Sequence, residues 1–323
     1  MAAQIIPTVT LNSVDAKPMP VLGLGTGGFP PSPPEVVIKA VLDAIELGYR
    51  MFDTAAFYQT EEALGEAICQ AVSIGLIKSR DEVFLTSKVW CNDTQADRIL
   101  PALQKTLQIM KLEYLDQYLV HWPVSLKPEA NPFALKPDDV LPLDLKSVWT
   151  VMEECQKLGL TKSIGVSNFS SKKVADILAF AKIPPAIVQV EFNPAWQQGK
   201  LKEFCEAKGI KVAAFSPLGA AGAFWGTKGV LGSEVLNEIA TSKGKSVAQV
   251  ALRWAYEQGV VVVMKSFNKD RLKQNQEIFD WELSAEESKK IAQIPQSRAN
   301  RGDNFVFENG PIKSVEELWD GEL

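Results

Sequence analysis

The feature that most constrains this chain is an alternation, repeated about eight times, of a short apolar run with a longer amphipathic stretch. Several short runs are apolar almost throughout, as expected for parallel strands that are covered on both faces. The expected strands are 21–24, 51–53, 83–88, 118–121, 163–166, 187–191, 211–215 and 260–264. Alternation of this kind indicates an α/β protein with a parallel sheet.

The longer stretches carry helical periodicity, as in Val37, Val41 and Ala44, which recur at three- and four-residue spacing. The expected helices are 34–47, 61–71, 97–110, 145–158, 171–181, 200–208, 233–243 with 246–258, and 269–279. Four of them are followed at once by a glycine, at positions 48, 159, 209 and 259, which is typical of a left-handed C-cap. Because no change of composition divides the eight units, we expect one domain, residues 1–323, folded as a closed (β/α)8 TIM barrel.

Two long loops and both ends of the chain complete this arrangement. The proline-rich loop 123–142 and the glycine- and alanine-rich loop 217–232 each follow a strand, so they should lie on the face where barrel enzymes keep their active sites. Residues 9–11 and 18–20 could form a small hairpin that closes the opposite end. A last helix near 285–293 precedes an irregular tail, which we expect over the active-site face.

Charge and residue usage exclude several kinds of partner. A formal charge of -5 gives no general attraction to nucleic acid or to anionic membranes. One histidine and four separated cysteines, without a CxxC pair, argue against a metal site. No basic segment followed by an apolar run opens the chain, and the longest apolar stretches, such as 260–264, are too short to cross a bilayer. We expect a cytoplasmic protein with free thiols, a small-molecule substrate and a monomeric state.

The segment Gly23-Leu24-Gly25-Thr26-Gly27-Gly28 matches the dinucleotide fingerprint GxGxxG letter for letter. That fingerprint requires a helix to begin within it, so that the pyrophosphate meets the helix N-terminus. Here four prolines within residues 30–34 follow, and proline removes amide donors and breaks the turn. We therefore reject the Rossmann interpretation and keep it only as the main structural alternative.

Polar residues stand at the carboxyl ends of the expected strands, and a barrel brings those ends together in one pocket. They are Asp53, Lys88, His121, Asn168, Gln189, Ser216 and Lys265. Singly, each has an ordinary explanation: Asp53 can be a turn residue, His121 a hydrogen-bonded core residue, and Tyr58 a loop aromatic. A lysine at a buried strand end is costly without a carboxylate partner, and Asp53 supplies that partner to Lys88.

These four residues suit the reduction of a carbonyl group. Hydride delivery to the carbonyl carbon leaves an alkoxide that needs a proton, and a tyrosine with a pKa of about 10 is a poor donor near neutral pH. A nearby Lys88 ammonium should lower the pKa of Tyr58 towards the value that a general acid needs. Asp53 would hold Lys88 in place, and His121 could orient the substrate oxygen beside Tyr58.

Five motifs carry a resemblance to a known family. They are GYRMFDTA at 48–55, TSKVW at 86–90, LVHWP at 119–123, GVSNF at 165–169, and Lys265-Ser266 with Arg271. In order and spacing they resemble the aldo-keto reductases over nearly the whole chain. The resemblance implies that Asp53, Tyr58, Lys88 and His121 form the catalytic tetrad, with Tyr58 as proton donor.

The same resemblance implies NADPH as the cofactor. Its expected contacts are Gly25, Thr26, Asp53, Ser167, Asn168, Gln189, Phe215, Ser216, Leu218, Lys265, Ser266, Phe267, Arg271, Gln274 and Asn275. Among them, Phe215 stands where the family usually has a stacking tyrosine. Independently of the resemblance, two cations near a helix N-terminus suit a phosphate dianion, although 269–271 could also be a solvated basic turn. Asn193 departs from the common histidine of the family.

The stretches 77–82, 245–250 and 278–283 resemble the plant branch of the family that serves specialised metabolism. That branch acts on alkaloid ketones, a polyketide intermediate and an amino-acid-derived oxo or imine compound, and the motifs do not choose among these. We expect an aromatic pocket for a bulky, partly apolar substrate. Its expected lining is Phe29, Tyr58, Trp90, His121, Trp122, Trp225, and the tail around Phe305 and Phe307.

Two other functions stay open at this point. One is a non-catalytic, cofactor-binding barrel subunit, against which an intact tetrad argues. The other is a lyase in which Lys88 forms a Schiff base, as in aldolase-type barrels.

Overall fold

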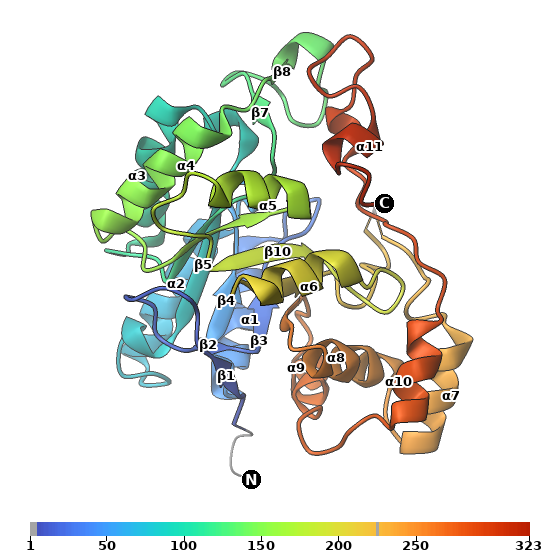
Figure 1. Ribbon diagram of the computed structural model, residues 1–323. Coiled ribbons are helices and arrows are strands. Elements are labelled where there is room, and N and C mark those ends of the chain that lie inside the picture. The colour runs from blue at the N-terminus through green and yellow to red at the C-terminus, as the bar shows by residue number, and fades with distance from the viewer. Residues whose placement is uncertain (1–4, 224–225) are drawn as a thin grey trace.

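The computed structural model describes residues 5–223 and 226–323, and its centre is a closed barrel of parallel strands (Figure 1). In order around the barrel they are β3 (Leu22–Gly25), β4 (Met51–Asp53), β5 (Phe84–Val89), β6 (Gln117–Val120), β9 (Ile164–Ser167), β10 (Ile187–Glu191), β11 (Lys211–Phe215) and β12 (Val261–Met264). The barrel closes where Val262 of β12 pairs with Leu22 of β3. This confirms the expected fold and rules out the open Rossmann sheet.

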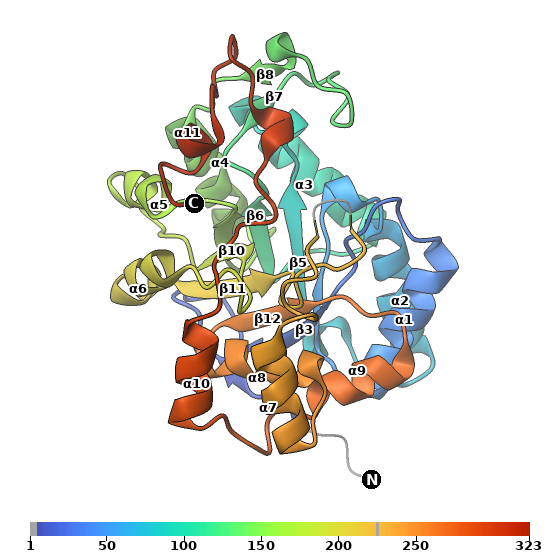
Figure 2. The same ribbon diagram turned by 90° about the vertical axis from the view of Figure 1, so that its right-hand side faces the viewer.

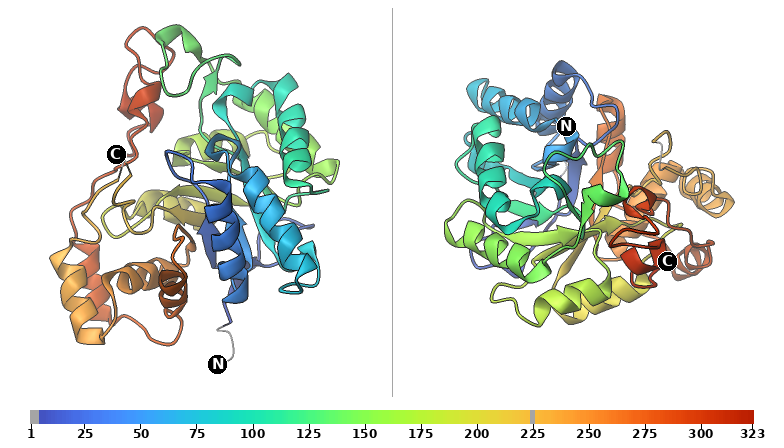
Figure 3. Two further views of the ribbon diagram at one scale, coloured as in Figure 1. Left: turned by 180° about the vertical axis from the view of Figure 1, so that it is seen from behind. Right: turned by 90° about the horizontal axis from the view of Figure 1, so that it is seen from above.

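Helices surround the barrel on the outside, as the view from above in Figure 3 shows. They are α1 (Pro34–Glu46), α2 (Glu61–Ser73), α3 (Ala96–Met110), α4 (Leu145–Lys157), α5 (Ser171–Leu178), α6 (Gly199–Ala207), α7 (Glu234–Lys243), α8 (Val247–Glu257), α9 (Lys269–Gln276) and α10 (Ala285–Ala292). Each expected helix is present, but α5 and α9 end three residues earlier than expected. The glycines at 48, 159, 209 and 259 all have positive φ, between 70° and 100°.

Local sequence explains where several helices begin. Pro34 opens α1, where its missing N–H costs no hydrogen bond. The side chain of Ser246 accepts from the backbone N–H of Gln249, and Gln249 reaches back to the N–H of Ser246, which makes a capping box at the start of α8. Ser284 and Glu287 do the same for α10. In α1 the buried positions lie on one face, which packs on the barrel.

The N-terminal end of the barrel is closed by a hairpin of β1 (Thr8–Val9) and β2 (Met19–Pro20), as expected. Leu11 and Met19 pack here against the first residues of the strands, among them Met51 and Ile187. This end of the barrel is therefore filled by apolar side chains, and the polar strand ends lie at the other end.

The long loop after β6 and the C-terminal tail lie together at that other end (Figures 1 and 2). The loop contains a short antiparallel pair, β7 (Ser125–Leu126) with β8 (Val140–Leu141), which the sequence did not predict. The tail rises from α10 and carries a one-turn helix, α11 (Val315–Leu318). Trp122 and Phe305 belong to the apolar cluster that joins loop and tail. In the described part of the chain, no helix is long and apolar enough to span a membrane.

Candidate active site

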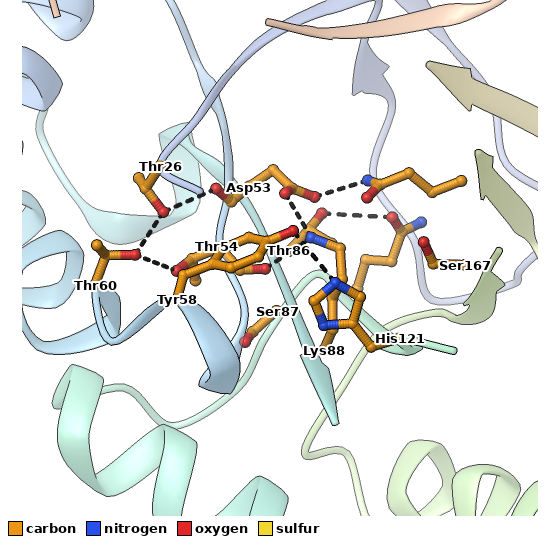
Figure 4. A network of polar contacts seen from close by, with 12 residues as sticks. Thr26, Asp53, Thr54, Tyr58, Thr60, Thr86, Ser87, Lys88, His121 and Ser167 are labelled. Carbon is orange, nitrogen blue, oxygen red and sulfur yellow. Dashed lines mark hydrogen bonds and ion pairs between the residues drawn. The ribbon is translucent and has the colours of Figure 1, made fainter. Parts of the chain in front are cut away.

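Four side chains from separate segments meet at the carboxyl end of the barrel (Figure 4). Asp53 is the last residue of β4, Lys88 lies in β5, and His121 directly follows β6. Tyr58 ends a 3-10 turn, η1 (Ala56–Tyr58), between β4 and α2. The structure therefore brings the four expected catalytic residues together.

Asp53 and Lys88 form a buried ion pair. Lys88 Nζ lies 2.5 Å from Asp53 Oδ1 and also donates to the carbonyl of Thr54 at 2.9 Å. The other carboxylate oxygen of Asp53 accepts from Nε2 of Gln189 at 2.8 Å. Burial is the largest single effect and disfavours the charged form of Lys88, but the charges and hydrogen bonds of Asp53 and Tyr58 together outweigh it, so the pKa of Lys88 is raised. Lys88 therefore stays an ammonium group.

The phenol of Tyr58 lies between Lys88 and His121. Its hydroxyl is 3.3 Å from Nε2 of His121, and Lys88 Nζ is 5.0 Å from the centre of its ring. Burial raises the pKa of Tyr58, and Lys88 offsets only part of that rise. The expected lowering of this pKa is therefore wrong in net direction, because desolvation of the phenolate exceeds the attraction of the ammonium. Tyr58 stays protonated near neutral pH.

His121 is neutral in this environment. Burial, followed by the charge of Lys88, holds the pKa of His121 well below its ordinary value. Its Nδ1 atom is buried without a hydrogen-bond partner among the described residues. Nε2 faces Tyr58, so a neutral imidazole can hydrogen-bond an oxygen placed between the two side chains.

The expected nicotinamide contacts lie beside the four residues. Ser167 ends β9, and Asn168 follows it with a left-handed backbone, φ 62°. Asn168 Nδ2 donates to the carbonyl of His121 at 3.0 Å, whereas its Oδ1 is buried and has no partner in the described part of the chain. An unpaired buried acceptor is costly, and the amide N–H of a carboxamide would satisfy it.

The expected pyrophosphate segment follows β11. Phe215 ends that strand and is partly buried, and Ser216 has φ 50°. The side chain of Asn193 donates to the carbonyl of Ser216 at 3.3 Å. Leu218 packs on the main core at the start of the long loop. Across the carboxyl end of the barrel, Gly25 ends β3, and Thr26 donates its N–H to the carbonyl of Asp53.

The expected 2′-phosphate segment surrounds the start of α9. Lys265 and Arg271 are both exposed, and neither forms an ion pair with a described residue. The backbone N–H of Arg271 is capped by Asn268. The remaining expected contacts of this segment are Ser266, Phe267, Gln274 and Asn275. Phe267 lies under the Lys265 ammonium, whereas Asn275 is buried and donates to the sulfur of Met264.

Aromatic rings lead from the four expected catalytic residues to the surface. Trp90 meets His121 edge-on with centroids 5.0 Å apart, and it stacks on Phe57 at 3.9 Å. Phe57 also contacts Phe133, which contacts Phe29 at 4.7 Å. Sequence reasoning missed Phe57 and Phe133, although an aromatic directly before the tyrosine and one in the long loop were both visible.

The other expected lining residues are placed differently. The ring centres of Trp122 and Phe305 are 5.2 Å apart, and the two residues are 6% and 1% exposed, so they pack behind the aromatic rings that line the pocket. Phe307 is partly buried and packs on the same cluster. Trp225 lies outside the described residues.

The C-terminal tail is fastened at two places. Near its start, the buried carboxylate of Glu191 accepts from the backbone N–H groups of residues 299 and 300. Next to that tie, Arg298 lies between two tryptophan rings, Trp196 and Trp319, with its guanidinium 4.7 Å and 3.4 Å from their centres. Arg298 thus holds the beginning and the end of the tail together.

The second fastening joins the end of the tail to α5. Asp320 accepts from the side chains of Ser170 and Lys173, and the Glu322 carboxylate accepts from the backbone N–H of Ser171 at 3.1 Å. A carboxylate is favourable at the N-terminus of a helix. Because Ser170 follows Asn168 by two residues, the tail is anchored beside the expected nicotinamide site.

Comparisons with known proteins agree with this geometry. Residues 21–296 match the model of the aldo/keto reductase family. The chain is 57% identical, over 98% of its length and 99% of the relative, to the (1S)-1,7-diacetoxy-luvungin A aldo-keto reductase of Citrus sinensis. It is 55% identical, over 94% of its length and 97% of the relative, to deoxymugineic acid synthase 1 of Zea mays.

Solved structures show the same fold. The aldo-keto reductase of Bombyx mori in complex with NADP superposes with a TM-score of 0.82 at 36% identity, over 92% of this chain and 95% of that one. The aldose reductase of Schistosoma japonicum gives a TM-score of 0.84 at 32% identity, over 93% and 96%. The chain belongs to the aldo/keto reductase family and is an oxidoreductase.

Proposed function

We propose that this aldo-keto reductase reduces the carbonyl group of a bulky, partly apolar plant metabolite, with NADPH as electron donor and Tyr58 as proton donor. The observation that carries the proposal is the placement of the Tyr58 hydroxyl 3.3 Å from Nε2 of His121, beside the buried Lys88–Asp53 pair. A carbonyl oxygen between Tyr58 and His121 can accept a hydrogen bond from each.

The chemistry follows from the protonation states. NADPH, when bound, would supply the hydride for the carbonyl carbon. Tyr58, which burial keeps protonated, donates its proton to the oxygen as negative charge develops there, and an alcohol results. The Lys88 ammonium stabilises the phenolate that remains, and Asp53 keeps Lys88 charged and in place. Neutral His121 orients the oxygen.

Several residues fit the coenzyme. Asn168, Ser167 and Gln189 would hold the nicotinamide carboxamide, since the Oδ1 of Asn168 is a buried acceptor in need of a donor. Phe215 would stack on the ring, and Ser216 and Leu218 would border the pyrophosphate. The other expected contacts follow the same pattern: Gly25, Thr26 and Asp53 on the opposite side, and Ser266, Phe267, Gln274 and Asn275 around the adenosine.

Two free cations support NADPH over NADH. Lys269 is paired with Asp43 and Glu46, whereas Lys265 and Arg271 are exposed without an ion pair to a described residue. A phosphate dianion is well bound by such groups beside a helix N-terminus. We therefore assign Lys265 and Arg271 to the 2′-phosphate.

Exposed aromatic side chains support the proposal of a bulky, partly apolar substrate. Phe29 and Phe133, on two different loops, are 49% and 53% exposed while they contact each other. An exposed aromatic pair at the mouth of a site favours a large apolar body outside the reacting group. The relatives named for acetylated luvungin A and for neemfruitin B point in the same direction. The four cysteines are free thiols, which suits the cytosol that we propose as its compartment.

The test is NADPH consumption by the purified protein against a panel of ketones, aldehydes and imines of increasing size. We expect turnover that prefers NADPH, is lost in Tyr58→Phe at unchanged NADPH affinity, and persists in the control Tyr114→Phe. Tyr114 is a phenol that bonds Asp81, away from the four catalytic residues. Arg271→Ala should weaken NADPH more than NADH. Full activity of Tyr58→Phe would end the proton-donor assignment, and equal losses for both coenzymes would end the 2′-phosphate assignment.

Experiments with the same purified protein distinguish the two alternative functions. Tight NADPH binding without turnover of any compound would favour a non-catalytic barrel. Trapping of Lys88 by borohydride with a carbonyl compound would favour a Schiff-base lyase. The paired ammonium of Lys88 argues against the second, because a Schiff base forms from the neutral amine.

A further inference from the structure

The hydroxyl of Thr60 does not do what a threonine at its position normally does. Thr60 is the N-cap residue of α2, where a threonine side chain commonly accepts from a backbone N–H of the first turn. No such bond exists here. Instead, the buried hydroxyl lies 2.7 Å from Oγ1 of Thr26 and 3.0 Å from Oγ1 of Thr54. The side chain joins α2 to the ends of β3 and β4 (Figure 4).

The direction of this chain of hydrogen bonds follows from the number of hydrogens. Thr26 gives its single hydroxyl hydrogen to the carbonyl of Asp53, at 3.2 Å. It must therefore accept from Thr60, which in turn accepts from Thr54. All three hydroxyls are buried, at 0–1% residue exposure. The chain of bonds runs from Thr54, whose carbonyl holds the Lys88 ammonium, to the backbone of Asp53.

The next residue makes a second tie. Glu61 is buried, and its Oε1 accepts from the hydroxyl of Ser87 at 2.6 Å and from that of Thr106 at 3.0 Å. Ser87 directly precedes Lys88 in β5, and Thr106 lies in α3. The first turn of α2 is thus bonded to the strand that carries the lysine.

The segment between Thr54 and Thr60 carries Tyr58, and it forms few backbone hydrogen bonds of its own. Within η1 only one short backbone bond forms, from the N–H of Tyr58 to the carbonyl of Ala55 at 2.9 Å; the next, from Gln59 to Ala56, measures 3.4 Å. Gln59 is exposed and left-handed, with φ 57°. Apart from the stacking of Phe57 on Trp90, this three-residue turn takes its orientation from its ends.

We propose that Thr60 and Glu61 are positioning residues that hold the Tyr58 turn at a fixed distance from Lys88 and His121. The inference rests on the proposed role of Tyr58 as proton donor. Neither residue needs to touch substrate or coenzyme: Thr60 acts through Thr54 and Asp53, and Glu61 acts through Ser87. Loss of either tie lets the phenol move relative to the ammonium, and displacement of a reacting group by about 1 Å can cost about 100-fold in rate.

The first experiment compares Thr60→Val, which keeps the shape and removes the hydroxyl, with Thr60→Ser, which keeps the hydroxyl. For Thr60→Val we expect kcat and the single-turnover rate of NADPH oxidation to fall by about 10- to 100-fold. The NADPH dissociation constant, measured by quenching of tryptophan fluorescence, should stay within about twofold, since Thr60 is not itself an expected coenzyme contact and its partner Thr26 keeps its backbone bond to Asp53. Thr60→Ser should retain most of the rate.

The second experiment uses two adjacent glutamates as a matched pair. Glu61 and Glu62 both lie in the first turn of α2, but only Glu61 is buried and bonded to Ser87. Glu61→Leu should lower kcat, whereas Glu61→Gln, which keeps an acceptor oxygen, should lower it less. Glu62→Leu should leave kcat and the NADPH dissociation constant unchanged.

Four results would overturn the proposal. They are full kcat in folded Thr60→Val, an equal loss in Thr60→Ser, equal losses for the leucine variants of Glu61 and Glu62, and a loss confined to NADPH affinity. If Thr60→Val does not fold, Thr54→Val is measured instead, because it removes only the hydrogen bond between the hydroxyls of Thr54 and Thr60. Full activity of Thr54→Val would refute the positioning role of Thr60. If the wild type turns nothing over, or if Tyr58→Phe stays active, the proposed function has failed instead.

Discussion

Replacement of Asp53 by asparagine should reveal how strongly the fold depends on the buried ion pair. Lys88 is 0% exposed, and Asp53 is the only anion in salt-bridge contact with it among the described residues. Removal of one partner of a buried pair costs about 3–5 kcal/mol, because the other charge is left without compensation. The lysine can escape this cost by losing its proton. From an ordinary pKa of about 10.4, that loss costs about 5 kcal/mol at pH 7.

The sign of the pH dependence separates this mechanism from simple loss of a hydrogen bond. In Asp53→Asn the pKa of Lys88 should fall below that of the unfolded chain, so the unfolded state binds more protons. The free energy of unfolding should then rise with pH by up to about 1.4 kcal/mol per unit between pH 7 and 9, relative to wild type. In the wild type the pKa of Lys88 is raised, so both states stay protonated across this range and the group adds no slope.

The assay is urea unfolding followed by far-UV circular dichroism at pH 7, 8 and 9. The double variant Asp53→Asn/Lys88→Met should recover most of the loss, because it buries no charge. Asp93→Asn, which breaks a partly exposed pair with Arg98, should cost less than about 1 kcal/mol. The reasoning is refuted if Asp53→Asn costs less than about 1 kcal/mol at pH 7, or if its stability shows the same pH dependence as the wild type.

Two further predictions concern the same pocket. A Cβ at Gly27 would lie 3.0 Å from Cε2 and Cζ of Tyr58, so Gly27→Ala should displace the phenol and lower kcat by about tenfold in steady-state assays; wild-type kcat would show that the ring can yield. His121, the only histidine, has a strongly lowered pKa, so the unfolded chain takes up a proton below pH 6.5 that the folded one does not. As the pH is lowered below 6.5, the unfolding free energy should therefore decrease, by up to about 1.4 kcal/mol per unit, and equal slopes in His121→Gln and wild type would contradict this.

The barrel could be predicted because its strands are covered on both faces. The run 211–215, apolar after its first residue, coincides with β11, and the wholly apolar run 260–264 contains β12. The β7–β8 pair was missed because two-residue strands in a proline-rich loop leave no alternation to detect. The early end of α9 was missed because no glycine or proline follows Gln276 to mark the end of the helix.

The grouping of the four expected catalytic residues could be predicted because a barrel brings all strand ends to one place. Two properties could not be found in this way. The net rise in the pKa of Tyr58 depends on depth of burial, which no local pattern encodes. Apart from the bond between Thr54 and Thr60, the bonds of Thr60 and Glu61 join residues 26 to 45 positions apart through single hydroxyls, and such pairs have no period.

Because the tail is attached at two defined places, its sequence can change separately from that of the barrel. Residues 301–318 form an arch between the tie at Glu191 and the tie at Asp320, and Phe305 of this arch lies against Trp90. Because the arch follows the last barrel helix, a single crossover near residue 300 exchanges the whole of it while every barrel strand keeps its own sequence. Recombination at this one junction would change the side chains that pack behind Trp90, provided that the incoming segment brings its own carboxylates for the start of α5.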